Sequence, residues 1–203
     1  MKNWTELPDQ KIIEKTIESL KANGIDAFSV ENGKEAKEKA LELIPQGAEI
    51  MTMTSVTLDS IGLPKEINES GKYDSVRNKL NSLDRKTQGR EMQKLGAAPE
   101  WVVGSVHGIT QDGKVLVASN TGSQLPAYVY GSDHVVWVVG AQKIVKDLDE
   151  AWKRLYEHTL PLESERLKKI YNVPSFVSKV LIVQKEIKPG RITMIIVKEV
   201  LGF

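Results

Sequence analysis

The amino-acid sequence predicts an α/β protein with a mostly parallel sheet, and three observations carry this prediction. Apolar runs at residues 101–103, 115–118 and 135–139 are short and rich in valine, which is typical of strands buried on both faces. In the N-terminal part, helix-like and strand-like patterns alternate, which favours parallel strands joined by right-handed crossovers. Asp112-Gly113 between two strand-like runs indicates an inserted antiparallel hairpin.

The first half of the chain supplies the alternating elements. Asn23-Gly24 gives the first helix a favourable C-terminal cap, and Asn32 with Glu35 resembles a capping box that starts the second helix. Pro45 ends that second helix. In chain order we expect a helix through residues 12–20, a strand at 25–30, a helix between 32 and 45, a strand at 48–53 and a helix at 58–69.

The second half adds the hairpin and a change of pattern at the C-terminus. Residues 177–183 and 192–197 have the composition of strands, and the turn Lys188-Pro189-Gly190-Arg191 between them fits type II. We therefore expect two C-terminal antiparallel strands. The remaining expected elements are helices over 124–130, 144–158 and 163–171.

Composition indicates one ordinary globular domain that spans residues 1–203. Of the 203 residues, 40% are hydrophobic and 27% are charged. There are no cysteines, which excludes disulfides, thiol catalysis and an iron–sulfur cluster on this chain. His107, His134 and His158 lack metal-ligand spacing, so no metal site is expected.

Charge and hydropathy indicate the location and the partners. The net charge of +1 does not favour a general attraction to nucleic acid or to an anionic membrane. No apolar run approaches the ~20 residues of a transmembrane helix, and the N-terminus has no signal-peptide core. We therefore expect a cytoplasmic protein with no nucleic-acid or membrane partner. The tryptophans and the final strands are compatible with a homo-oligomer without requiring one.

Polar residues after the strand at 115–118 are the first candidates for a ligand site. Small polar residues past a buried strand line the ligand crevice of α/β sheets, and a following helix adds unpaired backbone N–H groups. Gly122 allows a close backbone approach to a phosphate or carboxylate. A helix cap without any ligand is the alternative interpretation. These candidates are Asn120, Thr121, Gly122, Ser123 and Gln124.

Two further groups follow other strands. Thr54, Ser55 and Thr57 form a hydroxyl-rich turn after the strand at 48–53, where ordinary capping is the alternative to ligand binding. Two small or polar pairs directly follow the central apolar runs and complete the candidate ligand-binding set. These pairs are Gly104 with Ser105, and Gly140 with Gln142.

No complete catalytic set is visible, and three residues are weak candidates for catalysis. His107 titrates near working pH and can act as an acid or a base, although a strand histidine is more often structural. Lys143 can bind a carboxylate or phosphate as a point charge, and its expected place at a helix start opposes the helix dipole. Asp59 is a candidate acid or base.

Residues 72–94 are polar, with seven basic and three acidic side chains. A solvated helical face is the simpler interpretation. A mobile cover near the ligand is the sharper one, in which Arg85, Lys86 and Arg90 meet an anionic group. The sequence leaves both interpretations open.

Three segments, taken together with their order along the chain, resemble the lactate-utilisation (LUD) domain family. They are Asp112-Gly113, the run ASNTGSQLPA at 118–127, and the run VVGAQKIVKDLDEA at 138–151. The resemblance is strongest over residues 96–160. It implies a three-layer α/β/α domain similar to the NagB/RpiA/CoA-transferase group, with a mostly parallel sheet.

The resemblance also implies a function, since members of the family act with iron–sulfur partners that oxidise L-lactate to pyruvate. On that basis we expect an accessory component that binds a small anionic metabolite, with iron–sulfur oxidoreductase subunits as partners. The alternative is a stand-alone transferase or isomerase that acts on a CoA thioester or a phosphorylated small molecule. A sensor or assembly role is a third reading. The sequence identifies no cofactor.

Overall fold

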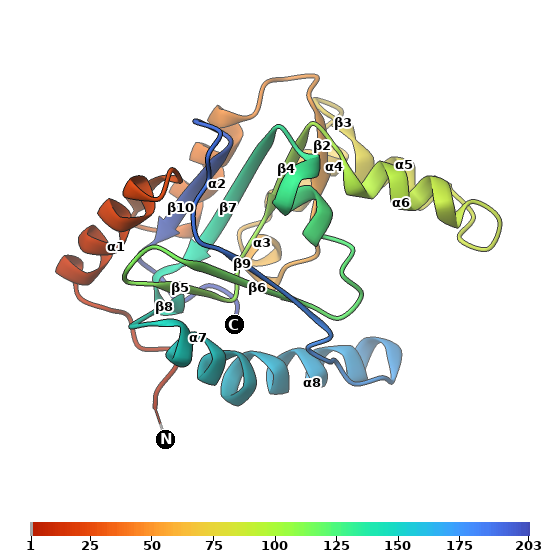
Figure 1. The fold of residues 1–203 in the computed structure, drawn as a ribbon. Coiled ribbons are helices and arrows are strands. Elements are labelled where there is room, and N and C mark those ends of the chain that lie inside the picture. The colour runs from red at the N-terminus through yellow and green to blue at the C-terminus, as the bar shows by residue number, and fades with distance from the viewer. Residues whose placement is uncertain (1) are drawn as a thin grey trace.

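The computed structural model describes residues 2–203, and it confirms the predicted α/β class (Figure 1). The larger of two sheets, sheet A, has the strand order β1-β10-β7-β4-β2-β3, and every neighbouring pair in it is parallel. Its strands are β1 Asp26–Val30, β2 Glu49–Thr52, β3 Asp74–Ser75, β4 Trp101–Gly104, β7 His134–Gly140 and β10 Ile192–Val197.

The smaller sheet B contains the inserted hairpin and has the order β8-β5-β6-β9. Its β5 and β6 pair antiparallel, as Asp112-Gly113 predicts, and Gly113 adopts a φ of 81° in the turn. Strand β9 also pairs antiparallel with β6, and their register runs from Val115 opposite Val183 to Ser119 opposite Lys179. The strands are β5 Gly108–Thr110, β6 Val115–Ser119, β8 Ile144–Val145 and β9 Lys179–Val183.

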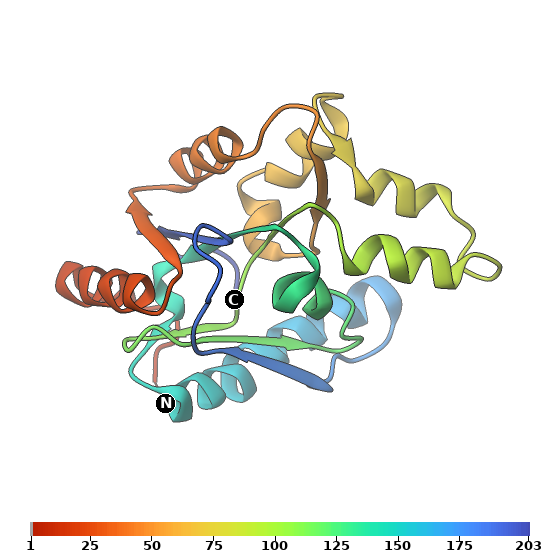
Figure 2. The ribbon, with the colours of Figure 1, turned by 45° about the horizontal axis from the view of Figure 1, so that its top comes forward.

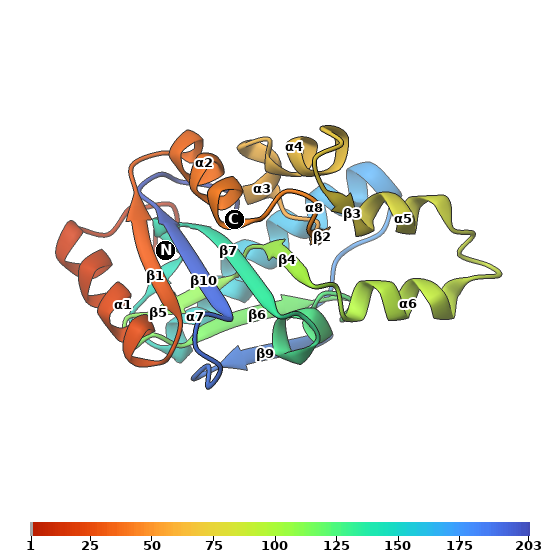
Figure 3. The same cartoon turned by 90° about the horizontal axis from the view of Figure 1, so that it is seen from above.

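Helices cover both sides of sheet A, which confirms the layered α/β/α plan (Figures 2 and 3). One face carries α2 Gly33–Leu43, α3 Val56–Ser60 and α4 Leu63–Glu69. Its other face packs against α1 Gln10–Ala22 and sheet B, whose outer face carries α7 Leu148–Arg154 and the π-helical turn η3 Leu155–Thr159. Helix α8 Leu160–Tyr171 continues from η3. Within residues 2–203, no helix has both the length and the apolar character that crossing a bilayer requires.

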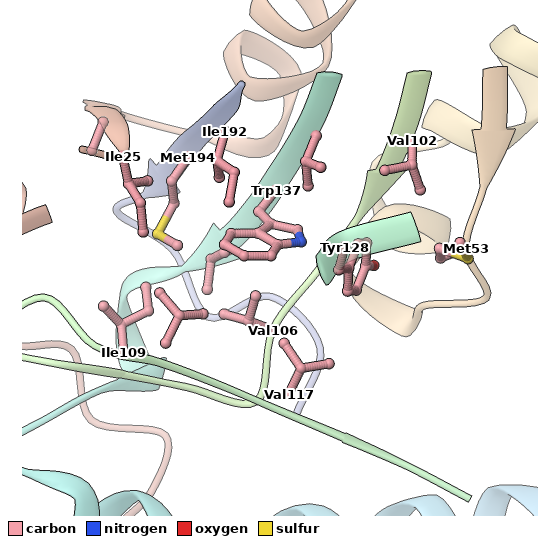
Figure 4. Close-up of a cluster of buried hydrophobic side chains, with 14 of the residues drawn as sticks. Ile25, Met53, Val102, Val106, Ile109, Val117, Tyr128, Trp137, Ile192 and Met194 are labelled. Atoms are coloured by element: carbon pink, nitrogen blue, oxygen red, sulfur yellow. The ribbon is translucent and has the colours of Figure 1, made fainter. Parts of the chain in front are cut away.

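The space between the two sheets is filled by large apolar side chains (Figure 4). Trp137 of β7 is fully buried there, with Val106 and Val117 in the same cluster. The ring of Tyr128 meets the Trp137 ring edge-on at a centroid distance of 5.4 Å, a favourable aromatic geometry. This core fixes sheet B against sheet A, and it therefore fixes the connections that run between them.

The C-terminal strands differ from the expected antiparallel pair. Strand β9 is antiparallel, but to β6 in sheet B, whereas β10 inserts between β1 and β7 of sheet A and is parallel to both. The turn at 188–191 therefore connects two sheets and closes no hairpin. The reason is burial, because the apolar run of β10 is covered on both faces and suits a central parallel strand. Arg191 reinforces the crossing by donating to the carbonyl of Ser132 at 2.9 Å.

Two expected helices are divided differently. The helix expected at 58–69 is two helices, α3 and α4, because Gly62 between them adopts a φ of 65°. The helix expected at 144–158 begins only at Leu148, after the short strand β8. Lys143 consequently lies at the end of a 3₁₀ turn, η2 Ala141–Lys143, and no helix begins there.

The basic segment 72–94 forms an arm that projects from the body of the molecule (Figure 1). It contains α5 Val76–Ser82 and leads into α6 Gly89–Ala97, which has no buried residue. Arg77 ties the base of the arm to β2 by donating to the Thr52 carbonyl through Nε at 3.2 Å and Nη2 at 2.5 Å. A covering role for this arm stays a prediction.

Candidate functional site

Three parallel strands of sheet A deliver polar residues to one edge. Strands β2, β4 and β7 are neighbours through β4, so their carboxyl ends face the same side of the sheet. The segments that leave these ends contain Thr57, Ser105 and Lys143. Ligands of open α/β sheets bind at this edge, outside the carboxyl ends of the strands.

Lys143 is the centre of this group. Its side chain is buried, with 2% of the residue exposed. Nζ donates to Thr57 Oγ1 at 3.0 Å and to Ser105 Oγ at 3.3 Å. The two hydroxyl oxygens lie 3.4 Å apart. Lys143 is therefore held by two neutral hydroxyls at the sheet edge.

A second buried cation, Arg154, lies at the end of α7. None of its surface is exposed. Its Nη1 donates to the His107 carbonyl at 2.7 Å and to Thr159 Oγ1 at 3.1 Å. Its Nε and Nη2 are buried and have no hydrogen-bond partner in residues 2–203. Two guanidinium nitrogens thus remain available to a group that the chain itself does not supply.

His107 lies two residues after Ser105, and its backbone carbonyl accepts the hydrogen bond from Arg154. Its Nδ1 accepts a hydrogen bond from the backbone N–H of Ala118 at 3.1 Å. Burial, Lys143 and Arg154 lower the pKa of His107 to about 3. The imidazole is therefore neutral at physiological pH and carries its proton on Nε2, as a neutral donor.

The electrostatics of the group are unbalanced. Burial, and secondarily Arg154, lowers the pKa of the Lys143 amine to about 7. His158 faces the same charges, since burial, Arg154 and Lys143 lower its pKa. Among the ion pairs formed by residues 2–203, none involves Lys143 or Arg154. We call Lys143, Arg154, His107, Thr57 and Ser105 the cationic cluster.

Asp59 lies two residues beyond Thr57 on α3 and is exposed. Partial burial raises the pKa of its carboxyl, and the charge of Arg166 on α8 opposes this rise. Arg166 is itself paired with Glu163 through two contacts of 2.7 Å. Asp59 is thus close enough to α8 to sense its charge, and an acid–base role stays a prediction.

The first-choice candidates at 120–124 lie on the loop after β6, and within residues 2–203 none of them shares a hydrogen bond with the cationic cluster. Their polar groups are used locally, because the Gly122 N–H donates to Ser119 Oγ at 2.8 Å and Gln124 Nε2 donates to the Ala118 carbonyl at 3.3 Å. The Thr121 hydroxyl donates to Ser123 Oγ at 3.0 Å, and Asn120 Oδ1 accepts from Ser178 at 3.3 Å.

The helix expected at 124–130 takes the form of a short turn that ends in the π-helical residues Ala127–Gly131. The loop at 120–124 therefore does not precede a regular α-helix with free N–H groups. Whether this loop contacts a ligand remains a prediction.

The remaining candidates either precede α3, which carries Thr57 of the cationic cluster, or serve packing. Thr54 is exposed, and Ser55 precedes α3 without a side-chain cap bond. Gln142 holds the C-terminal segment, with Nε2 donating to the Leu201 carbonyl at 3.0 Å. The space beside Gly104 is filled by the Tyr128 hydroxyl, and that beside Gly140 by Gln142. Both glycines are thus needed at least for close packing.

Sequence reasoning missed Arg154 and His158. Both belong to the expected helix, where a basic residue near the C-terminal end is the common, solvated case. Helical spacing could have indicated both residues, because Arg154 follows Ala151 by three residues and precedes His158 by four. These three residues therefore lie on the buried stripe of the helix.

The structure also contains an open depression of about 660 Å³ that belongs to a different place. It lies at the N-terminus of α2, and its lining includes Asn32, Lys34, Lys37 and Glu199. The Glu199 carboxylate already accepts from the Gly33 N–H at 2.9 Å, so this helix terminus is occupied by the chain itself. The cationic cluster does not line this depression.

Fold and site together define an α/β protein that gathers buried cations at the carboxyl edge of a parallel sheet. The family model described as the LUD domain matches residues 13–202, so the chain belongs to the LUD domain family. A DUF162 family protein from Deinococcus radiodurans has a similar solved structure, with a TM-score of 0.58 and 11% identity. The alignment covers 95% of this chain and 99% of that one, and it supports the shared fold. No curated protein matches.

Proposed function

We propose that this LUD-domain protein binds a small organic anion at the cationic cluster. The observation that carries the proposal is the pair of buried cations, Lys143 and Arg154, which form no ion pair within residues 2–203. Burying an unpaired charge costs several kcal/mol, and natural proteins tolerate this cost mainly at functional sites. An anion that enters the cluster would supply the missing negative charge.

The donors indicate what kind of anion fits. The two free guanidinium nitrogens of Arg154 form the planar fork that matches the two oxygens of a carboxylate or phosphate. Ser105 adds a hydroxyl that can bind a hydroxyl or carbonyl oxygen of the same molecule, while the Thr57 hydroxyl donates to the Leu201 carbonyl. A small hydroxy acid, oxo acid or phosphorylated metabolite combines these features.

In the cell, we infer a role as an accessory component in the use of lactate or a related organic acid. Family membership supports this role. The chain has no cysteine, so any iron–sulfur cluster needed for oxidation of the acid would belong to a partner subunit. We expect the tagged protein, purified from its own cells, to bring down a partner that carries iron and acid-labile sulfide.

A second function is favoured by the surroundings of the Lys143 amine, which is buried and bonded to two neutral hydroxyls, so that burial lowers its pKa to about 7. A buried amine that is partly neutral at physiological pH can act as a base or nucleophile. The protein would then be a stand-alone transferase or isomerase for a CoA thioester or a phosphorylated substrate. Turnover by the purified protein alone, lost in Lys143→Gln, would distinguish this function from an accessory role.

A thermal-shift screen tests the proposed binding directly. Lactate, pyruvate, nucleotides, CoA and sugar phosphates are each added to the purified protein, because a ligand that binds only the folded state raises the midpoint. We expect a rise with at least one small anion, and its loss in Lys143→Gln and Arg154→Met. Lys169→Gln, at an exposed lysine of α8, serves as the matched control for Lys143→Gln and should keep the rise. An equal rise in all variants would place the anion elsewhere.

A further inference from the structure

We propose that Lys143 Nζ forms an imine with the carbonyl carbon of a small aldehyde or ketone that carries an anionic group. This inference rests on the proposed anion site and names the substrate class of that site. It is drawn from the juxtaposition of a buried amine held only by hydroxyls and a buried guanidinium with two unused nitrogens.

The surroundings of Lys143 are those of a nucleophile. A lysine that serves only structure is normally exposed or paired with a carboxylate. Lys143 is buried, and its two hydrogen bonds go to Thr57 Oγ1 and Ser105 Oγ. A neutral amine has two N–H donors and one lone pair, so these two hydroxyls satisfy both donors and leave the lone pair for reaction. The lowered pKa of the amine keeps this neutral form populated near pH 7.

Arg154 supplies the second half of the site. Its Nη1 is used by the His107 carbonyl and by Thr159, which fixes the plane of the guanidinium. The remaining Nε and Nη2 are buried and unpartnered within residues 2–203, and together they form a bidentate donor. A carboxylate or phosphate bound there would hold the carbonyl compound in place and supply the charge that the cluster lacks.

Imine formation balances without any further reactant. The Nζ lone pair attacks the carbonyl carbon, the C–N bond forms, and the π electrons move to oxygen, which takes a proton. The C–O bond then breaks, and both former Nζ hydrogens leave with that oxygen as water. No atom is oxidised or reduced overall. Ser105 accepts from Nζ and is partly exposed, so it is placed to relay these protons, whereas the Thr57 hydroxyl already donates to the Leu201 carbonyl at 3.2 Å.

The carbonyl compound would enter where the cluster reaches the surface. Ser105 and His107 are partly exposed, whereas Thr57 and Lys143 are buried behind them. The neutral imidazole of His107 presents its Nε2–H as a donor that needs no counter-charge. A carbonyl compound that enters beside Ser105 and His107 would therefore meet this neutral donor before the amine.

Reductive trapping tests the inference. Pyruvate and dihydroxyacetone phosphate, representing oxo acids and phosphorylated ketones, are each incubated with the protein and sodium borohydride. Intact-mass and peptide mass spectrometry then locate the adduct. We expect one adduct per chain on Lys143, with its yield reaching half-maximum near pH 7, and the better of the two probes identifies the anionic group. Lys34→Gln, at a lysine whose side chain is 85% exposed, should trap like the wild type.

Three variants separate the imine from the anion site. Lys143→Arg keeps a positive charge and should still bind the anion by calorimetry while forming no adduct. Lys143→Gln should lose the adduct and weaken binding. Ser105→Ala, a small change that leaves the buried amine in place, should lower the trapping rate about 10-fold through loss of proton relay. Circular dichroism checks that each variant is folded before it is compared with the wild type.

The outcomes distinguish the two proposals. Anion binding by the wild type without a Lys143 adduct would overturn the imine and leave the anion site standing. Adducts spread over exposed lysines, unchanged in Lys143→Gln, would overturn the imine as well. Absence of both binding and adduct would overturn the proposed function together with this inference.

Discussion

At the residue scale, the chain keeps two buried cations that it does not neutralise. Lys143 and Arg154 are 2% and 0% exposed, and hydroxyls and a carbonyl are their only hydrogen-bond partners within residues 2–203. Packing alone would be served better by apolar side chains of the same size. Stability is therefore sacrificed at this point of the molecule, which is typical of a functional site.

Replacing Lys143 by methionine should raise stability while it removes binding. Lys143→Met keeps the length of the side chain, removes the desolvated amine and leaves Thr57 and Ser105 close enough to bond to each other. We expect a gain of about 1–3 kcal/mol in the free energy of unfolding and at least a tenfold loss of anion affinity. Urea denaturation and calorimetry measure the two effects. A marked loss of stability would mean that the amine is structural.

The histidine in the cluster predicts a pH dependence. The pKa of His107 is about 3 in the folded protein and 6.5 as its ordinary value, so between these values the unfolded chain binds a proton that the folded protein does not. The free energy of unfolding therefore rises with pH between these two values. As the pH falls through the same window, the contribution of neutral His107 to stability is lost. His107→Gln should show a shallower slope than the wild type in urea denaturation between these pH values. Parallel curves would contradict the neutral state of His107 in the folded protein.

At the element scale, patterns predicted the elements well and their partners less well. Asn32 does cap α2, accepting from the Glu35 N–H at 3.0 Å, and Asp112-Gly113 does close the hairpin. The turn at 188–191 misled, because local turn chemistry does not reveal that β10 is covered on both faces and enters the other sheet. Lys143 was expected at a helix start, since the short strand β8 is too brief to give a pattern.

The candidate site was also predictable only in part, because the strand pattern indicates the sheet edge but not the contacts made there. Parallel strands bring their carboxyl ends together, so Ser105 and Lys143 could be placed on one edge from the strand pattern alone. Their hydrogen bonds to each other and to Thr57 depend on how the segments turn after the strands. Arg154 comes from a helix packed on sheet B, and only the tertiary fold brings it to this edge.

A glycine at the end of β4 should be indispensable for packing. A Cβ added to Gly104 would lie 1.7 Å from the Tyr128 hydroxyl, so Gly104→Ala forces the ring or the strand to move. We expect a loss of about 1–3 kcal/mol in the free energy of unfolding, measured by urea denaturation. Gly89→Ala is the matched control, because no atom lies within 4 Å of its added Cβ and it begins α6. Equal effects of the two substitutions would contradict the packing argument.

At the scale of the whole molecule, the fold explains how remote segments form one site. Sheet A delivers Thr57, Ser105 and Lys143, and the core around Trp137 holds sheet B against sheet A (Figure 4). Helix α7 packs on the outer face of sheet B through a separate apolar cluster. Arg154 reaches the His107 carbonyl because α7 packs on sheet B, whose strand β5 begins directly after His107. The solved DUF162 family structure has a similar fold at 11% identity, so the architecture persists while the residues change.

Calorimetric titration of the wild type and Lys143→Met with a small anion from the screen is the most direct test of the central claim. The pKa of Lys143 is about 7, so at about pH 8 a bound anion should draw a proton onto the amine, seen as a difference between two buffers of unlike ionisation enthalpy. We expect binding with proton uptake in the wild type and neither in Lys143→Met. Binding that is equally tight in both proteins, with no proton uptake, would contradict it.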